Sequence, residues 1–81
     1  MIHVRYFARL REQLGCEAET LSGGFATVSE VIEHLCARGE PWTALAKDPT
    51  LLMAINQELA RPTDVLREGD ELAFFPPVTG G

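Results

Sequence analysis

The sequence predicts a two-layer α+β domain, in which one main helix packs across one face of a small mixed sheet of about five strands. Residues 2–7 alternate between two sets of side chains, as a half-buried strand does. Residues 27–36 instead repeat their apolar side chains at helical spacing behind a capping motif. The chain has 81 residues, which is enough for one such domain and too few for two.

The chain opens with an expected strand over residues 2–7. Its two faces carry different side chains, with Ile2, Val4 and Tyr6 on one and His3, Arg5 and Phe7 on the other. A short amphipathic helix is expected over residues 8–14, because Leu10 and Leu14 share a face and Gly15 favours a left-handed stop. Residues 17–21 precede a Ser-Gly-Gly turn and are interpreted as an edge strand.

The main helix is expected to begin at Thr27, which forms a capping box with Glu30. Its apolar stripe should face the sheet and consists of Val28, Val31, Ile32, Leu35 and Cys36. Gly39 and Pro41 end the helix. Residues 42–46 can add one more helical turn, and Trp42 is expected to plug the core over the end of the main helix.

Three further strands complete the predicted sheet. Residues 51–56 and 58–60 are expected to pair across a tight Asn56-Gln57 connection. A turn at residues 68–70 leads into the last strand at residues 71–75. We therefore expect a domain over residues 1–75 and a flexible C-terminal tail, residues 76–81, that ends in Gly-Gly.

Composition and charge exclude several classes of function. Twelve acidic and seven basic residues give a net charge of −5, which repels nucleic acid and anionic lipid surfaces. No apolar run reaches the length of a signal peptide, and none approaches the roughly 20 residues that span a bilayer. We therefore expect a cytoplasmic protein without nucleic-acid or membrane partners.

The tail has the composition of a carrier arm. Pro76 and Pro77 favour extended backbone, so six residues can reach about 20 Å into a partner. ATP can convert a terminal carboxylate into a mixed anhydride with adenylate, and glycine leaves both faces of the reacting carbonyl open. Gly80 and Gly81 fit that chemistry. Gly-Gly also occurs at frayed termini, so the dipeptide alone leaves both interpretations open.

Three segments carry a family resemblance: residues 2–8 with residues 10–12, residues 54–57, and residues 69–81, which read GDELAFFPPVTGG. The chain resembles the small-subunit family of molybdopterin synthase, whose members are ubiquitin-like sulfur carriers with a β-grasp fold. The closing segment is the most specific of the three. Residues 17–49 match the family only in pattern.

The resemblance implies a reaction cycle at the end of the chain. An adenylating activating enzyme would consume ATP at Gly81, and sulfur from a donor protein would convert the adenylate to a thiocarboxylate. Through Val78, Thr79 and Gly80 the tail would enter the large synthase subunit and donate sulfur to cyclic pyranopterin monophosphate. In this family the carrier binds no cofactor and has no autonomous catalytic site. It acts as the sulfur-donating subunit of a sulfurtransferase, in a heterotetramer of two small and two large subunits.

The β-grasp resemblance also implies a partner surface. If the first and last strands pair in parallel at the sheet centre, Phe7 and Phe75 lie on the face away from the main helix, joined by Leu59. Exposed apolar clusters usually mark interfaces, so these residues are candidate partner contacts. Strand twist or a bulge can instead turn one phenylalanine inward.

Charged and metal-ligating residues give weaker signals. Arg11, with Arg5 and Arg9, belongs to the main basic concentration of the chain, which can meet an acidic rim or simply remain solvated. The zinc-ligand types, at His3, His34, Cys16 and Cys36, match no zinc-binding spacing, so no metal site is expected. Both cysteines are interpreted as free thiols, with Cys16 incidental.

Two other functions remain open from the sequence. A sulfur carrier of another pathway, such as a thiamin-type carrier, would share the fold and the Gly-Gly end, although residues 74–79 favour the molybdopterin branch. An unmodified β-grasp binding module would keep its function without Gly80 and Gly81, whereas a carrier would lose all sulfur transfer.

Overall fold

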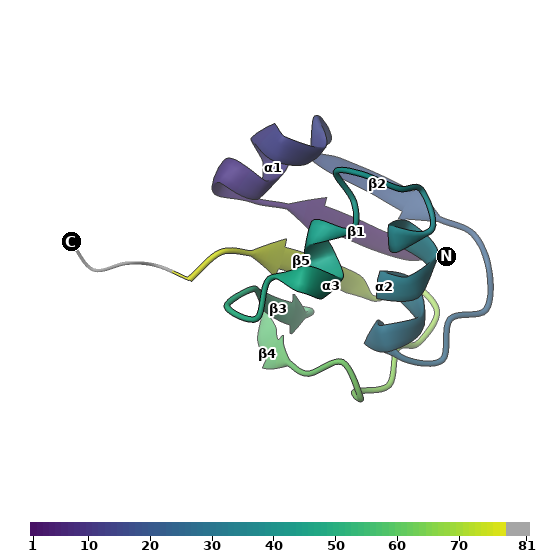
Figure 1. Cartoon of the computed structure of the whole chain (residues 1–81). Helices are drawn as coiled ribbons and strands as arrows, with labels where there is room; N and C mark the ends of the chain where they lie inside the picture. Colours follow the sequence, from purple (N-terminus) through teal and green to yellow (C-terminus); the bar gives the residue numbers. More distant parts are fainter. Residues whose placement is uncertain (78–81) are drawn as a thin grey trace.

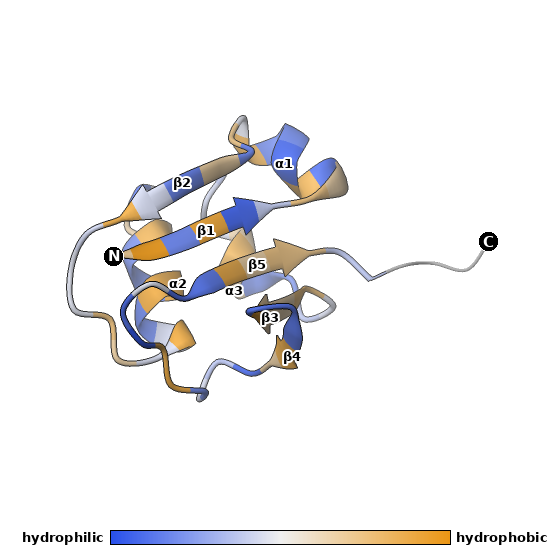
Figure 2. Cartoon of the chain, turned by 180° about the vertical axis from the view of Figure 1, so that it is seen from behind, coloured by the Kyte–Doolittle hydropathy of each residue, from blue (hydrophilic) through white to orange (hydrophobic). Residues whose placement is uncertain are grey.

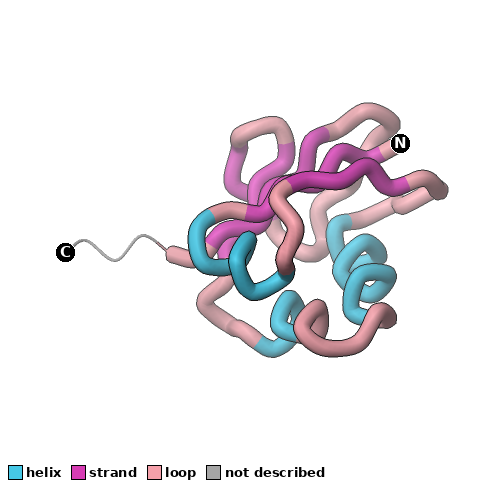
Figure 3. The backbone as a smooth tube through the Cα atoms, turned by 90° about the horizontal axis from the view of Figure 1, so that it is seen from above, coloured by secondary structure: helices cyan, strands magenta, loops and turns pink. Residues whose placement is uncertain are grey.

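The computed structural model describes residues 1–77 and consists of one mixed five-stranded sheet with helices against it (Figure 1). The strands are β1 (Ile2–Tyr6), β2 (Ala18–Leu21), β3 (Leu52–Ile55), β4 (Glu58–Ala60) and β5 (Glu71–Phe75). The helices are α1 (Ala8–Leu14), α2 (Val28–Cys36) and α3 (Ala44–Lys47). Seen from above, the strands form one layer and α2 lies in a second (Figure 3).

The sheet order is β2-β1-β5-β3-β4, so the first and last strands of the chain are neighbours at its centre. β1 and β5 run parallel, with Val4 opposite Leu72, and every other pair is antiparallel. The Phe7 amide donates a hydrogen bond of 3.1 Å to the Phe74 carbonyl, which continues the parallel ladder beyond β1. The two-layer α+β prediction and the parallel central pair are both confirmed.

One core lies between the sheet and the helices. Val28, Val31 and Leu35 of α2 are buried, and Ile32 and Cys36 pack against the core from its edge. The predicted apolar stripe is therefore confirmed, because these side chains recur on the side of α2 that meets the sheet. The sheet side of the core comes from alternate strand residues, Ile2, Val4, Tyr6, Met53, Leu72 and Phe74.

The start of α2 confirms the predicted cap and changes one partner. Thr27 Oγ1 accepts a hydrogen bond from Glu30 N at 3.4 Å, as a capping box requires. Glu30 Oε1 accepts from Ala26 N at 3.1 Å, one residue before the amide that the standard box would use. Both bonds satisfy amides at the helix entrance, so the sequence places the start of the helix correctly.

The β3–β4 hairpin fixes the start of β5. Asn56 and Gln57 both have positive φ, 49° and 71°, as a type I′ turn requires. Asn56 Nδ2 donates to Asp70 Oδ1 at 2.9 Å, and Asn56 Oδ1 accepts from Glu71 N at 3.0 Å. The turn therefore holds the first residue of the strand that leads to the C-terminal residues.

Several predicted boundaries move by one or two residues. β1 ends at Tyr6 and β2 begins at Ala18, each one residue inside the prediction. Ala8 has φ of 55°, in the left-handed region, and this bend turns the chain from β1 into α1 directly after Phe7. β5 ends at Phe75, and the tail assignment over residues 76–81 stays a prediction. Within residues 1–77, no helix has the length and apolar character that crossing a membrane requires.

Candidate functional site

The face of the sheet away from α2 carries an apolar patch. Figure 2 looks onto this face, where β5 changes from hydrophilic at its start to hydrophobic at its end. Strand register places Leu52 opposite Phe75 and Leu59 opposite Ala54. We call Phe7, Leu52, Leu59 and Phe75 the open-face patch.

The patch is exposed to different degrees. Leu59 is 76% exposed, Phe7 and Leu52 are each 38% exposed, and Phe75 is half-buried. Between them the sheet surface is made of the small residues Ala54 and Ala73, which lie opposite each other. Large apolar side chains exposed around a flat centre are typical of a surface that another protein covers.

The patch lies at the end of the sheet from which the C-terminal residues leave. β5 runs parallel to β1, so Phe75 and Phe7 lie at the same end of the two central strands. Pro76 and Pro77 follow directly and are half-buried. The predicted tail residues Val78, Thr79, Gly80 and Gly81 lie outside the described residues.

The structure places Phe7, Leu59 and Phe75 on one face, as the sequence predicts, and neither phenylalanine is turned into the core. Sequence reasoning missed Leu52. Residues 51–54 form a continuous apolar run, in which alternation is hidden. The signal that could have found Leu52 is its register opposite Phe75, which requires the β3–β5 pairing to be known.

The three arginines near the patch differ in their surroundings. Arg5 lies with its guanidinium 5.1 Å from the centre of the Phe7 ring. Arg11 lies on α1, its backbone amide donates to the Phe7 carbonyl at 3.4 Å, and its guanidinium is 4.0 Å from a Glu17 carboxylate oxygen. Arg9 is exposed on the same helix. Of these three arginines, Arg5 is the one whose side chain is in contact with a member of the open-face patch.

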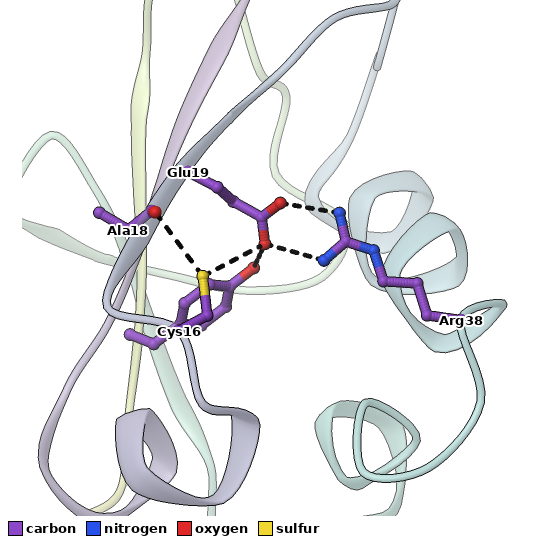
Figure 4. A network of polar contacts seen from close by, with 5 residues as sticks. Cys16, Ala18, Glu19 and Arg38 are labelled. Atoms are coloured by element: carbon purple, nitrogen blue, oxygen red, sulfur yellow. Dashed lines mark hydrogen bonds and ion pairs between the residues drawn. The ribbon is translucent and has the colours of Figure 1, made fainter.

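A polar network lies on the core side of the sheet, near the end of β1 (Figure 4). Its centre is Glu19 of β2, which accepts from the Tyr6 hydroxyl at 2.8 Å. Arg38, which follows α2, donates two bonds of 2.9 and 2.7 Å to the Glu19 carboxylate. The Arg38 guanidinium also lies 4.4 Å from the Trp42 ring centre, and Trp42 packs edge-on against Tyr6 with ring centres 5.4 Å apart. Trp42 therefore covers the end of the core, as predicted.

The network shifts the pKa of four groups, and its hydrogen bonds to Glu19 raise the pKa of Arg38. The bonds from Arg38 hold the pKa of the Glu19 carboxyl below its usual range. Burial, and then the hydrogen bond to Glu19, raises the pKa of Tyr6. Burial and the nearby Glu19 charge raise the pKa of the Cys16 thiol, which donates to the Ala18 carbonyl at 3.6 Å. A raised pKa disfavours the reactive thiolate form of Cys16, which fits its interpretation as incidental.

Sequence reasoning missed this network, because Glu19 and Arg38 are far apart in the chain and no local motif joins them. Both cysteines are free, as predicted. Among residues 1–77, no three histidine, cysteine, aspartate or glutamate side chains gather closely enough to hold a metal ion.

Comparison with known proteins identifies the family. The ThiS family matches residues 4–81, which is nearly the whole chain. The chain belongs to the ThiS family. It is 46% identical over 81 residues to the molybdopterin synthase sulfur carrier subunit of Haemophilus influenzae and 43% identical over 81 residues to that of Escherichia coli K12. Each match covers all of both chains. The resemblance found in the sequence is therefore confirmed.

Solved structures confirm the β-grasp fold of this ThiS family member. SAMP1 from Haloferax volcanii superposes with a TM-score of 0.77 and 30% identity, over 99% of this chain and 98% of that one. A chain in the complex of subunits 1 and 2 of molybdopterin-converting factor from Helicobacter pylori superposes with a TM-score of 0.69. That match covers 99% of this chain and 97% of the other at 22% identity, so it supports the fold alone.

Proposed function

We propose that this chain is the sulfur carrier subunit of a molybdopterin synthase. The observation that carries the proposal is its full-length identity of 46% and 43% to two proteins of that name. The family match by itself does not choose the pathway, whereas these two relatives favour the molybdopterin branch over a thiamin-type carrier.

The proposed chemistry takes place at the carboxyl group of Gly81. ATP supplies an adenylate to that carboxylate and releases pyrophosphate, in a step that belongs to the activating enzyme. A sulfide equivalent from a donor protein then forms a C–S bond at the same carbon, and AMP leaves. The product is a thiocarboxylate, which donates its sulfur to cyclic pyranopterin monophosphate. Water attacks the Gly81 carbonyl carbon as its C–S bond breaks, which leaves the sulfur on the pterin and returns Gly81 to a carboxylate, and two such transfers complete the dithiolene.

The residues next to Gly81 suit passage through a narrow site. Gly80 has no side chain to block the reacting carbonyl and adopts dihedral angles that other residues avoid. Thr79 and Val78 connect the glycines to Pro76 and Pro77, whose fixed φ angles favour an extended arm. In this proposal the chain supplies the sulfur and its partners supply the catalytic side chains.

The large synthase subunit is the proposed partner of the open-face patch. The patch includes Phe75, the last strand residue before the predicted tail. One docked partner can therefore cover Phe7, Leu59 and Phe75 while it receives the tail. Leu59 also borders a hollow of about 420 Å³, lined in part by Ile55 and Val65, that a partner side chain can enter. A heterotetramer with two large subunits is part of the proposal.

The remaining elements of the cycle are proposed with it. ATP is consumed by the activating enzyme, the sulfur comes from a donor protein, and this chain binds no cofactor. A cytoplasmic location fits, because the two free thiols, Cys16 and Cys36, suit a reducing compartment.

Deletion of Gly80 and Gly81 tests the proposal against an unmodified binding module. The shortened chain, the large subunit, the activating enzyme, ATP, a sulfur source and cyclic pyranopterin monophosphate are combined, and molybdopterin formation is measured. The full-length chain should support the reaction. The shortened chain should fold with an unchanged unfolding midpoint and yield no product. Product formation by the shortened chain would contradict the carrier role.

A further inference from the structure

Arg5 is a cation placed within an apolar surface. Among the strand residues whose side chains lie on the face away from α2, Arg5 is the only lysine or arginine. Its guanidinium lies against Phe7, a member of the open-face patch. The chain carries twelve acidic residues, yet among residues 1–77 no carboxylate oxygen lies within ion-pair distance of Arg5. Arg11, in contrast, has Glu17 beside it.

The neighbours of Arg5 leave it uncovered. Strand register places Ala18 of β2 on one side of it and Ala73 of β5 on the other. Both side chains are single methyl groups, so the Arg5 side chain remains exposed above them. A partner that covers Phe7 would therefore cover the Arg5 guanidinium as well.

Covering that surface changes the electrostatic situation of Arg5. A guanidinium has five N–H donors and stays charged at any ordinary pH. A partner that covers Phe7 removes water from this group, and a buried charge without a counter-charge is strongly unfavourable. The contact with the Phe7 ring is too weak to replace the lost hydration. A carboxylate fits best, because it accepts two parallel bonds from one guanidinium.

We propose that the partner surface that covers the open-face patch presents an aspartate or glutamate to Arg5, beside an apolar area that covers Leu59 and Phe75. Arg5 is then a specificity-determining residue, because a partner without that carboxylate would leave a buried guanidinium unpaired. The inference rests on the proposed function for the identity of the partner, the large synthase subunit. It adds a requirement for the chemistry of that partner, which the apolar patch alone does not set.

Affinity measurements with the large subunit from the same organism test the inference. The full-length chain and its Arg5→Leu, Arg5→Lys and Arg5→Glu variants are titrated in a calorimeter at low and high salt. Arg67→Leu is the matched control, since Arg67 lies in the exposed turn at the opposite end of β5. Thermal unfolding of each variant checks that it folds.

Removing the cation should leave the partner carboxylate buried and unpaired. We expect Arg5→Leu to weaken binding at least about 30-fold, and Arg5→Glu to weaken it further. Arg5→Lys should keep part of the affinity, and Arg67→Leu should stay within about twofold of wild type. An acidic-to-arginine substitution on the large subunit should restore binding of Arg5→Glu and identify the pairing residue.

Two results would overturn the inference, and they are distinguishable. If the wild-type chain does not bind the large subunit, the proposed function fails and the inference fails with it. If the wild-type chain binds and supports molybdopterin formation, but Arg5→Leu binds equally tightly or more tightly, the inference alone is wrong.

Discussion

Leu59 offers the sharpest test of the open-face patch, because its side chain contributes little to the fold and much to the surface. We consider the substitution Leu59→Ala. The change removes three carbon atoms, each worth about 0.8 kcal/mol when fully buried. Leu59 is 76% exposed in the free chain, so about three quarters of this contribution is available to a partner. The expected loss of binding free energy is therefore about 1.8 kcal/mol, or roughly 20-fold in Kd.

The same substitution should leave the free chain almost unchanged. A side chain that is mostly in water loses few contacts when it is truncated, so the free energy of unfolding should change by less than about 0.5 kcal/mol. Calorimetric titration of the large subunit measures the affinity, and urea unfolding of the free chain measures the stability. Arg67→Leu is a useful control, because Arg67 lies in the exposed turn at the opposite end of β5, away from the open-face patch.

The two measurements together decide the interpretation. We expect weaker binding of Leu59→Ala at unchanged stability, and Arg67→Leu close to wild type in both. If Leu59→Ala binds the large subunit with the wild-type Kd, the partner does not cover β4 and our placement of the interface is wrong. If both variants weaken binding equally, the loss of affinity does not report a contact at the open-face patch.

Three further predictions concern other parts of the chain. Because Arg38 lowers the pKa of Glu19, this carboxylate should contribute stability above about pH 4 that is lost as the pH falls through its lowered pKa, and urea unfolding of Glu19→Gln should lack this acid-dependent loss. If Glu19→Gln loses as much stability in acid as the wild-type chain does, the Glu19 network is not the source of that loss. Gln57→Gly should stabilise the chain by about 0.5 kcal/mol, since Gln57 has a φ of 71° that glycine adopts without strain; a lower thermal midpoint would contradict this. Gly81→Ala should slow ATP–pyrophosphate exchange by the activating enzyme severely without changing the unfolding midpoint, and wild-type exchange would refute a tightly fitted tail.

Much of the fold is predictable because its signals are local. Thr27 and Glu30 mark a helix start within four residues, and the alternation of residues 2–7 is a two-residue pattern. The two-residue connection at Asn56 and Gln57 predicts a hairpin from turn chemistry alone. The parallel pairing of β1 with β5 has no such local signal. It followed from the family resemblance, because register between distant strands depends on the whole sheet.

The candidate site is predictable to a similar extent. Phe7 and Phe75 follow from alternation once the two central strands are paired, whereas Leu52 lies in a uniformly apolar run that does not reveal its face. The hydrogen bonds that Tyr6 and Arg38 donate to Glu19 join β1, β2 and the segment after α2, which only the folded chain brings together. The position of Arg5 against Phe7 likewise requires side-chain geometry.

A mass spectrum of the chain tests the central claim most directly. The purified protein is incubated with ATP, a sulfur source and the activating enzyme, and is then fragmented to locate any change. Fragmentation is essential, because replacement of oxygen by sulfur has the same nominal mass effect as oxidation of Met1 or Met53. We predict a sulfur-for-oxygen replacement confined to Gly81. An unmodified Gly81, with an activating enzyme that is shown to modify a known carrier, would contradict the assignment of this chain as a sulfur carrier.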